Sequence, residues 1–254
     1  MINFYKYEAT GNDFILIENL KDLKNEEIIE LVVKMCNRHY GIGADGVLLL
    51  YNTQYKNYLR IFNADGSEAS MCGNGLRCCA LHIINEGFNE NKFSIHTLSG
   101  EKIINIEKDL ISVSVGQPRL IKTFKDVLQR IQYSLINVGN LHAVVEVDDV
   151  RSLDLEEIVK KNFKNRQFNI TFVSLGMKKD TLNVRVYERG VGETLSCGSG
   201  SVAAYFYMRN LNKIGRKAEI NLPGGNLIVK EGNNKELILQ GPASFVFKGD
   251  YNNE

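Results

Sequence analysis

The chain has 254 residues and a mass of 28.7 kDa, enough for one or two domains with packed cores. Apolar residues make up 44% and charged residues 24%, with only 3 prolines, which is typical of an ordered soluble protein rather than a disordered or collagen-like one. The 31 Lys and Arg nearly balance the 30 Asp and Glu, and a net charge of +1 argues against a nucleic-acid or anionic-membrane partner and favours a small molecule.

The sequence also indicates where the protein resides. No apolar run reaches the roughly 18 residues that a bilayer span needs. The start, Met1–Glu8, meets a lysine and a glutamate before a signal-peptide core could form, so we expect a cytoplasmic location. The 5 cysteines are an odd number in a reducing compartment, which predicts reduced thiols rather than structural disulfides.

Short β-branched runs bounded by Gly, Asn or Asp predict strands along most of the chain. These runs are Asp13–Glu18, Val47–Tyr51, Tyr58–Phe62, Ile111–Val115, Ala143–Val147, Ile170–Leu175 and Leu237–Gln240.

Three helices are predicted between these strands. Glu26–Cys36 has the pattern of a surface helix, with Asn25 as its N-cap and acidic residues in its first turn. Apolar spacing also predicts helices through Leu76–Ile83, ending near Gly87, and through Val202–Arg209.

Two parts of the chain repeat each other. Leu59–Gly75 aligns with Val184–Gly200 at an offset of 125 residues, and the same offset pairs Gly116 with Gly241. A constant offset over this length indicates two homologous lobes. We predict an N-terminal lobe over residues 1–117 and a C-terminal lobe over 118–242, with the tail 243–254 as a candidate to complete the first lobe.

The predicted fold class is α+β. In each lobe, an antiparallel, barrel-like sheet is expected to wrap around one central helix, and a pseudo-twofold axis is expected to relate the lobes.

The repeat places one cysteine at the same point in each lobe. Cys72 and Cys197 each stand between a glycine turn and a predicted helix, where unpaired N–H groups and the positive end of the helix dipole favour a thiolate. The glycines that follow would let a substrate approach the backbone. Each Cys-Gly-x-Gly corner therefore predicts a nucleophile or base beside an anion-binding backbone.

If the lobes face one another, a small carboxylate could lie between both helix ends. Two thiols in one cleft would repel each other if both ionised, so one would be a thiolate and the other a thiol. A base and an acid on opposite faces of one carbon are what inversion of a Cα–H centre requires. The sequence therefore predicts a racemase or epimerase that needs no metal, redox cofactor or Schiff-base lysine.

The cysteines also admit other interpretations. Cys36, Cys78 and Cys79 fall on apolar helix faces and are expected to be structural. A metal site from Cys72, Cys78, Cys79 and His82 is disfavoured, because it has no copy in the second half and lacks Cys-x-x-Cys spacing. A Cys72–Cys197 disulfide would be an inactivated state. A non-catalytic amino-acid-binding module is the alternative from another class.

The motifs together resemble the diaminopimelate epimerase family over nearly the whole chain. The resemblance rests on Thr10–Phe14, Phe62–Glu68, Met71–Cys78, Val138–His142, Glu188–Thr194, Cys197–Gly200 and Leu222–Gly225. It implies interconversion of LL- and meso-diaminopimelate, on the route to lysine and peptidoglycan, without a cofactor. A homodimer is compatible with it. A racemase of another amino acid, or of a related diaminodicarboxylic acid, is the alternative with the same mechanism.

The resemblance also implies roles for individual residues. Cys72 and Cys197 would be the catalytic acid and base, assisted by His142 and Glu188. The residues that would bind the substrate are Asn12, Asn63, Gly73, Asn74, Asn140, Asn169, Glu188, Arg189, Gly198 and Ser199. Without the resemblance, His142 would be interpreted as a structural histidine, Asn12 as a turn residue and Glu188–Arg189 as a surface ion pair.

Overall fold

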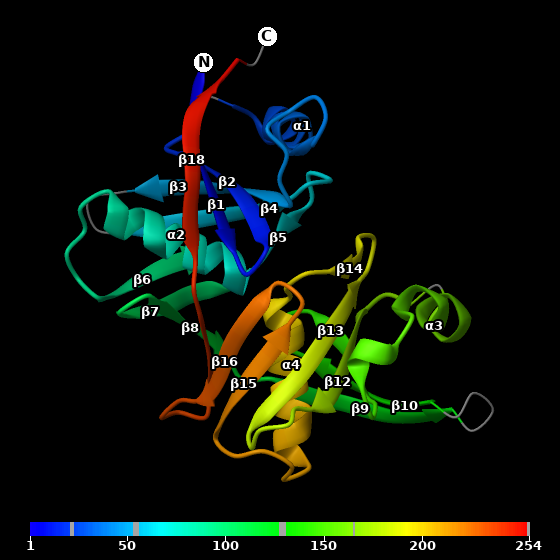
Figure 1. The fold of residues 1–254 in the computed structure, drawn as a ribbon. Helices are drawn as coiled ribbons and strands as arrows, with labels where there is room; N and C mark the ends of the chain where they lie inside the picture. Colours follow the sequence, from blue (N-terminus) through cyan, green and yellow to red (C-terminus); the bar gives the residue numbers. More distant parts are fainter. Residues whose placement is uncertain (21–22, 53–55, 127–130, 165, 253–254) are drawn as a thin grey trace. The chain divides into compact units, whose positions relative to one another are not determined.

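The computed structural model describes residues 1–20, 23–52, 56–126, 131–164 and 166–252. The chain divides into two compact units. Unit 1 comprises Met1–Val113 and Gly241–Glu254, and unit 2 comprises Ser114–Gln240. Among the described residues, each unit carries two α-helices between its strands (Figure 1), which confirms the α+β class. The structure contains no helix, in the described part, that is long and apolar enough to cross a membrane.

Unit 1 is built mainly of strands. Its elements are β1 (Ile2–Ala9), β2 (Asn12–Glu18), α1 (Asn25–Cys36), β3 (Gly46–Asn52), β4 (Asn57–Asn63), β5 (Glu68–Ala69), α2 (Gly73–Asn85), β6 (Lys92–Thr97), β7 (Gly100–Glu107), β8 (Leu110–Gly116, which runs into unit 2) and β18 (Ser244–Tyr251).

Unit 2 has the same character. Its elements are β9 (Arg119–Asp126), β10 (Ile131–Asn137), β11 (Leu141–Glu146), the 3₁₀ turn η1 (Val150–Ser152), α3 (Leu155–Asn162), β12 (Asn169–Leu175), β13 (Thr181–Glu188), β14 (Gly192–Thr194), α4 (Gly198–Asn210), β15 (Lys217–Leu222), β16 (Gly225–Glu231) and β17 (Leu237–Gly241). The strands predicted from the sequence are all present, with ends that differ by about one or two residues.

Strand pairing follows the same order in the two units. In unit 1, β1 pairs antiparallel with β2, β2 parallel with β3, β3 antiparallel with β4, and β4 with both β5 and β6. In unit 2, β10, β11, β12 and β13 repeat these pairings, and β13 lies beside β14 and β15. The repeat predicted from the 125-residue offset is therefore confirmed in the topology.

One long helix lies at the centre of each unit. Helix α2 packs against β1, β2, β3 and β18, and α4 packs against β10 to β13, β15 and β16 (Figure 1). The side chains of Cys79 and Ala80 on α2 and of Ala203 and Ala204 on α4 are completely buried. Small residues at these positions let the strands approach the middle of each helix closely.

The first helix begins one residue earlier than predicted. Asn25 is the first helical residue of α1, and Lys24 occupies the N-cap position. The Lys24 N–H donates to Oε2 of Glu27 at 2.6 Å, while Oδ1 of Asn25 accepts from Nη2 of Arg60 at 3.2 Å. The prediction of an Asn25 cap is wrong because a long-range partner occupies that side chain and Glu27 satisfies the orphan N–H instead.

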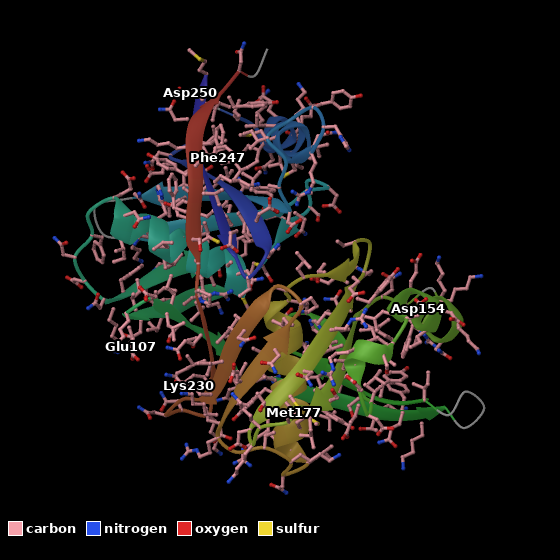
Figure 2. The ribbon with its side chains drawn as sticks, viewed as in Figure 1. Glu107, Asp154, Met177, Lys230, Phe247 and Asp250 are labelled. Atoms are coloured by element: carbon pink, nitrogen blue, oxygen red, sulfur yellow. The ribbon has the colours of Figure 1, made fainter. Side chains whose placement is uncertain are left out.

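Strand β18 belongs to unit 1 although it ends the chain. It pairs antiparallel with β1, from Ile2 opposite Tyr251 to Glu8 opposite Ser244. Phe247, labelled on β18 in Figure 2, packs edge-to-face against Phe4 with ring centres 5.8 Å apart. Backbone pairing and aromatic contact together hold this strand on unit 1.

Candidate functional site

Cys72 is the N-cap residue of α2. Its backbone is extended (φ −143°, ψ 116°), and its Sγ accepts a hydrogen bond from the N–H of Gly75 at 3.4 Å. Cys72 is partly exposed, whereas Cys78 and Cys79 on the same helix are buried. This thiol therefore reaches solvent at the N-terminal end of the helix, which is the end that favours a negative charge.

The second glycine of each Cys-Gly-x-Gly corner is required by packing. A Cβ on Gly75 would lie 2.9 Å from Cδ2 of Leu48, and a Cβ on Gly200 would lie 2.6 Å from Cγ2 of Val186. Whether this glycine also lets a substrate approach the backbone stays a prediction at these two positions. The glycine lets the first helical turn pack directly on a strand, which fixes the direction of the cysteine.

Asn12 and Asn74 contact each other beside Cys72. Nδ2 of Asn74 donates to Oδ1 of Asn12 at 3.1 Å, and Nδ2 of Asn12 donates to Oδ2 of Asp45 at 2.7 Å. Asp45 was not predicted from the sequence. The parallel pairing of β2 with β3 brings its loop to Asn12, and its carboxylate sets the orientation of both amides, because a carboxylate only accepts.

Asp45, the hydrogen-bond partner of Asn12, belongs to a network of charged side chains. Asp13 pairs with the buried Lys6 at 2.6 Å and with Arg38 at 2.8 Å, and Arg38 also reaches Asp45 at 2.8 Å. Burial opposes ionisation of Asp13, but hydrogen bonds from Arg38 and Lys6 lower its pKa to about 2. Asp13 is therefore ionised at neutral pH, and the network holds the loop that carries Asp45 against β2.

Asn63 ends β4 and takes part in a turn. Its Nδ2 donates to Oγ of Ser67 at 2.9 Å, and its N–H donates to the Ser67 carbonyl at 2.9 Å. The residue 125 positions later, Glu188, ends β13, and its Oε1 accepts from the hydroxyl of Thr194 at 2.8 Å. Equivalent strand ends thus carry a neutral amide in unit 1 and a carboxyl group in unit 2.

Cys197 is the N-cap residue of α4 and is buried. Its Sγ lies 3.4 Å from Oγ of Ser199. That hydroxyl lies 2.9 Å from Nε2 of His142 and accepts from Nδ2 of Asn140 at 3.3 Å. Four of the predicted residues of unit 2, Cys197 included, therefore form one connected set.

His142 is a completely buried member of this set. Its Nδ1 lies 2.8 Å from Oγ1 of Thr171, so both ring nitrogens have a hydroxyl partner. Burial lowers the pKa of His142 to about 3. The imidazole is therefore uncharged at neutral pH, and it acts as a hydrogen-bond partner and not as a cation.

Asn169 links His142 to the Glu188–Arg189 turn. Its Nδ2 lies 3.4 Å from Nε2 of His142, and its Oδ1 accepts from the Arg189 N–H at 3.0 Å. The Arg189 guanidinium donates from Nη1 to Oε1 of Gln167 at 2.8 Å. Within unit 2, one chain of contacts thus runs from Asn140 through Ser199, His142 and Asn169 to Arg189.

Four supporting residues were missed in the sequence: Asp45 and Arg77 in unit 1, and Thr171 and Gln167 in unit 2. Period-two spacing could have found the last two, because Gln167, Asn169 and Thr171 are two residues apart and β12 carries Asn169 and Thr171 on one face. No local signal indicates Asp45 or Arg77, whose contacts join residues distant in the chain.

The other thiols lie in apolar surroundings. Burial raises the pKa of Cys36 to about 12 and raises that of Cys78 and Cys79 well above its usual range. His82, considered with them as a metal ligand, instead contacts the Tyr7 hydroxyl through Nδ1 at 3.1 Å. Within the described ranges, no three His, Cys, Asp or Glu side chains are grouped as metal ligands would be.

Comparison with known proteins gives a consistent result. A family model described as diaminopimelate epimerase matches residues 4–121 and 134–246. The diaminopimelate epimerase of Nostoc punctiforme is 36% identical over 278 residues, which cover 98% of this chain and 99% of that protein. That of Carboxydothermus hydrogenoformans is 34% identical over 276 residues, with coverage of 98% and 99%.

Solved structures share the fold. A predicted epimerase from Pseudomonas aeruginosa has a TM-score of 0.73 at 12% identity, covering 99% of both chains. A hydroxyproline epimerase from Agrobacterium vitis has a TM-score of 0.72 at 11% identity, covering 98% of this chain and 91% of that one. At such identities the likeness shows the architecture alone.

Proposed function

The chain belongs to the diaminopimelate epimerase family, and we propose on that basis that it interconverts LL- and meso-diaminopimelate at one α-carbon. The observation that carries the proposal is the repeated N-cap cysteine: Cys72 starts α2 and Cys197 starts α4, 125 residues apart in matched surroundings. Identity over nearly the full length to proteins named diaminopimelate epimerase supports the same substrate.

The proposed reaction needs only the two thiols. One sulfur, as thiolate, removes the α-hydrogen as a proton and becomes a thiol. The other sulfur, as thiol, gives its proton to the opposite face of the carbanion and becomes a thiolate. Charge and proton number are unchanged over the cycle, so neither a metal nor an organic cofactor is required.

The N-terminal ends of α2 and α4 would stabilise the negative charges of the substrate α-carboxylate and of the carbanion. Backbone N–H groups at Gly73 and Asn74 and at Gly198 and Ser199 would bind the substrate α-carboxylate, since the amino ends of α2 and α4 favour anions. Two half-charges sum to about one positive charge. Such a site lowers the cost of the carbanion because its negative charge develops next to the same donors.

The remaining polar residues are assigned to the other groups of the substrate. Asn12, Asn63, Asn140, Asn169 and Arg189 would bind the amino groups and the distal carboxylate. Glu188, held by Thr194, would orient the reacting amino group. His142, neutral and bonded to Ser199, would fix the hydroxyl next to Cys197.

The direct test is incubation with LL-diaminopimelate in D₂O, with deuterium uptake at the α-carbon and formation of the meso isomer as the two readouts. Cys72→Ala and Cys197→Ala should each reduce epimerisation by ~10²–10⁴-fold, the usual contribution of a general acid or base. Cys36→Ala, which removes a buried thiol of unit 1, is the matched control and should turn over normally. Near-normal turnover in either of the first two variants would rule the proposal out.

The pH dependence gives a second test. Because one thiol must be ionised and the other protonated, kcat/KM should fall on both the acid and the alkaline side. A profile that stays flat through the thiol range would contradict the assigned roles.

Two rival functions have distinct outcomes in the same experiment. Faster exchange with a monocarboxylic amino acid would indicate a racemase of another substrate, and binding without any deuterium uptake would indicate a binding module. We place the protein in the cytoplasm, where its small-molecule substrate for lysine biosynthesis is expected.

A further inference from the structure

The two central helices differ at one buried position. Arg77 lies on α2, and the residue 125 positions later on α4 is Val202. Arg77 is completely buried and Val202 is 1% exposed. The repeat is therefore broken by a charge inside unit 1, five residues after Cys72, where unit 2 has an aliphatic side chain.

Neutral groups bind the Arg77 guanidinium. Its Nε donates to the Pro242 carbonyl at 3.1 Å, Nη1 to the Gly73 carbonyl at 3.3 Å, and Nη2 to Oγ1 of Thr10 at 3.4 Å. Among the ion pairs of the described residues, none joins Arg77 to a carboxylate. A buried cation held by carbonyl and hydroxyl dipoles is solvated but not neutralised.

Arg77 nevertheless stays charged. Burial lowers its pKa to about 10, so the guanidinium is protonated at neutral pH. The negative groups that act on it are the thiolate forms of Cys78 and Cys72 and the carboxylate of Glu8. Of these, Cys78 is buried and protonated, because burial raises its pKa well above the usual range. Glu8 lies on β1 and accepts from the Gly11 N–H at 3.0 Å.

Of the two N-cap thiols, Cys72 therefore has the surroundings that favour the thiolate form more strongly. It is partly exposed, and it caps the helix whose first carbonyl binds Arg77. Its ionisation would add a negative charge, besides that of Glu8, to the groups that act on the buried cation. The contact described for Cys197 is of another kind, because its Sγ lies next to the Ser199 hydroxyl, which is bonded to the neutral imidazole of His142.

We propose that Arg77 is a positioning residue whose buried charge makes Cys72 the thiolate of the pair in the substrate-free protein and leaves Cys197 as the thiol. This assignment rests on the proposed two-thiol function for its catalytic meaning, but its test uses no substrate. It follows from Coulomb attraction in a medium where water does not screen the guanidinium.

The experiment is alkylation of the full chain by iodoacetamide over a range of pH, with the extent at each cysteine measured by peptide mass spectrometry. The thiolate is the reactive form. In the unsubstituted protein, the midpoint of the Cys72 profile should lie below that of Cys197. Arg77→Met should move the Cys72 midpoint up by about one pH unit or more, which slows its alkylation about tenfold at lower pH, and should leave the Cys197 midpoint in place.

Two further variants separate charge from packing. Arg77→Lys keeps the cation and should restore the low Cys72 midpoint, while Val202→Met, the matched change on α4, should move neither profile. An unchanged Cys72 midpoint in folded Arg77→Met, verified by its circular dichroism and melting curve, would overturn the proposal. If Arg77→Met does not fold, the unsubstituted protein still decides, since a Cys197 midpoint at or below that of Cys72 would refute the assignment.

Failure here and failure of the proposed function are distinguishable. Loss of epimerase activity in Cys72→Ala with no Arg77 effect on alkylation would preserve the two-thiol reaction and reject only the role of Arg77.

Discussion

Oγ of Ser199 lies 2.9 Å from Nε2 of His142, and the same hydroxyl lies 3.4 Å from Sγ of Cys197. The Ser199 hydroxyl therefore links a buried neutral imidazole to the thiol. Because Thr171 holds the other ring nitrogen at 2.8 Å, the ring cannot turn without breaking a buried hydrogen bond. His142 is thus held in place to fix the direction of the Ser199 hydroxyl, which is the role that we propose for it.

The first prediction concerns that hydroxyl. Ser199→Ala should lower kcat/KM for diaminopimelate by roughly 10- to 100-fold, since a hydrogen bond to a charged group contributes about 1.5–3 kcal/mol. Deuterium wash-in under substrate-limited conditions measures it. Ser134→Ala, which removes a buried hydroxyl bonded to Thr123 at 2.9 Å in the same unit, is the control. Equal rates for both variants would remove Ser199 from the mechanism.

The second prediction concerns the pH dependence of stability. The pKa of folded His142 is about 3, below the value of about 6.5 for an unfolded histidine. As the pH falls, the unfolded chain therefore binds the proton first. The stabilisation from neutral His142 is complete above about pH 6.5 and is lost progressively toward pH 3, at up to about 1.4 kcal/mol per pH unit.

Urea unfolding at several pH values between about 4 and 6 checks this prediction. The slope of the unfolding free energy against pH reports the number of protons taken up on unfolding. His142→Gln should reduce this number by close to one, whereas His39→Gln, on an exposed loop, should leave the slope unchanged. A slope in His142→Gln equal to that of the unsubstituted protein would show that another group governs this pH range.

The third prediction concerns the orientation of Asn12. Asp45→Ala removes the acceptor of the Asn12 amide and the second partner of Arg38. We expect KM to rise about tenfold with a smaller change in kcat, because a binding group is misplaced while the thiols are untouched. Asp45→Asn keeps one acceptor oxygen and should recover part of the loss. Asp109→Ala, in an exposed turn of unit 1, should change neither constant.

The fourth prediction concerns the helix start in unit 2. A Cβ on Gly200 would lie 2.6 Å from Cγ2 of Val186 and 3.2 Å from Oγ1 of Thr171. Val186 is β-branched and cannot move aside easily, so Gly200→Ala should lower the unfolding free energy by about 1–3 kcal/mol and displace Cys197. A Cβ on Gly75 would overlap the flexible end of Leu48 at 2.9 Å and would meet Cys72 at ordinary contact distances of 3.6 and 3.8 Å, so Gly75→Ala should lose less stability.

A double variant tests the cause of that loss. Gly200→Ala combined with Val186→Ala should be more stable than the sum of the two single changes indicates, because the second change removes the overlap. Strict additivity in urea unfolding would mean that the overlap is relieved in some other way.

Much of the fold could be predicted because it is encoded locally. Alternating β-branched runs such as Ile170–Leu175 specify strands, and the duplicated Cys-Gly-x-Gly corner specifies two helix starts with a thiol at each N-cap. The first helix shows where local information ends. Asn25 is a good N-cap by type, but Arg60, 35 residues away, binds its side chain, and Glu27 provides the cap.

By itself, the sequence determined the repeat, the α+β class, the two thiols and the family, since each depends on residues close together or at a constant offset. Only the tertiary structure decided which residues support the polar groups near those thiols. Asp45 accepts a hydrogen bond from Asn12, Thr171 is bonded to His142, and Arg77 is buried among neutral partners. The physical reason is that such contacts depend on strand register and burial, which join residues tens of positions apart and leave no trace in local spacing.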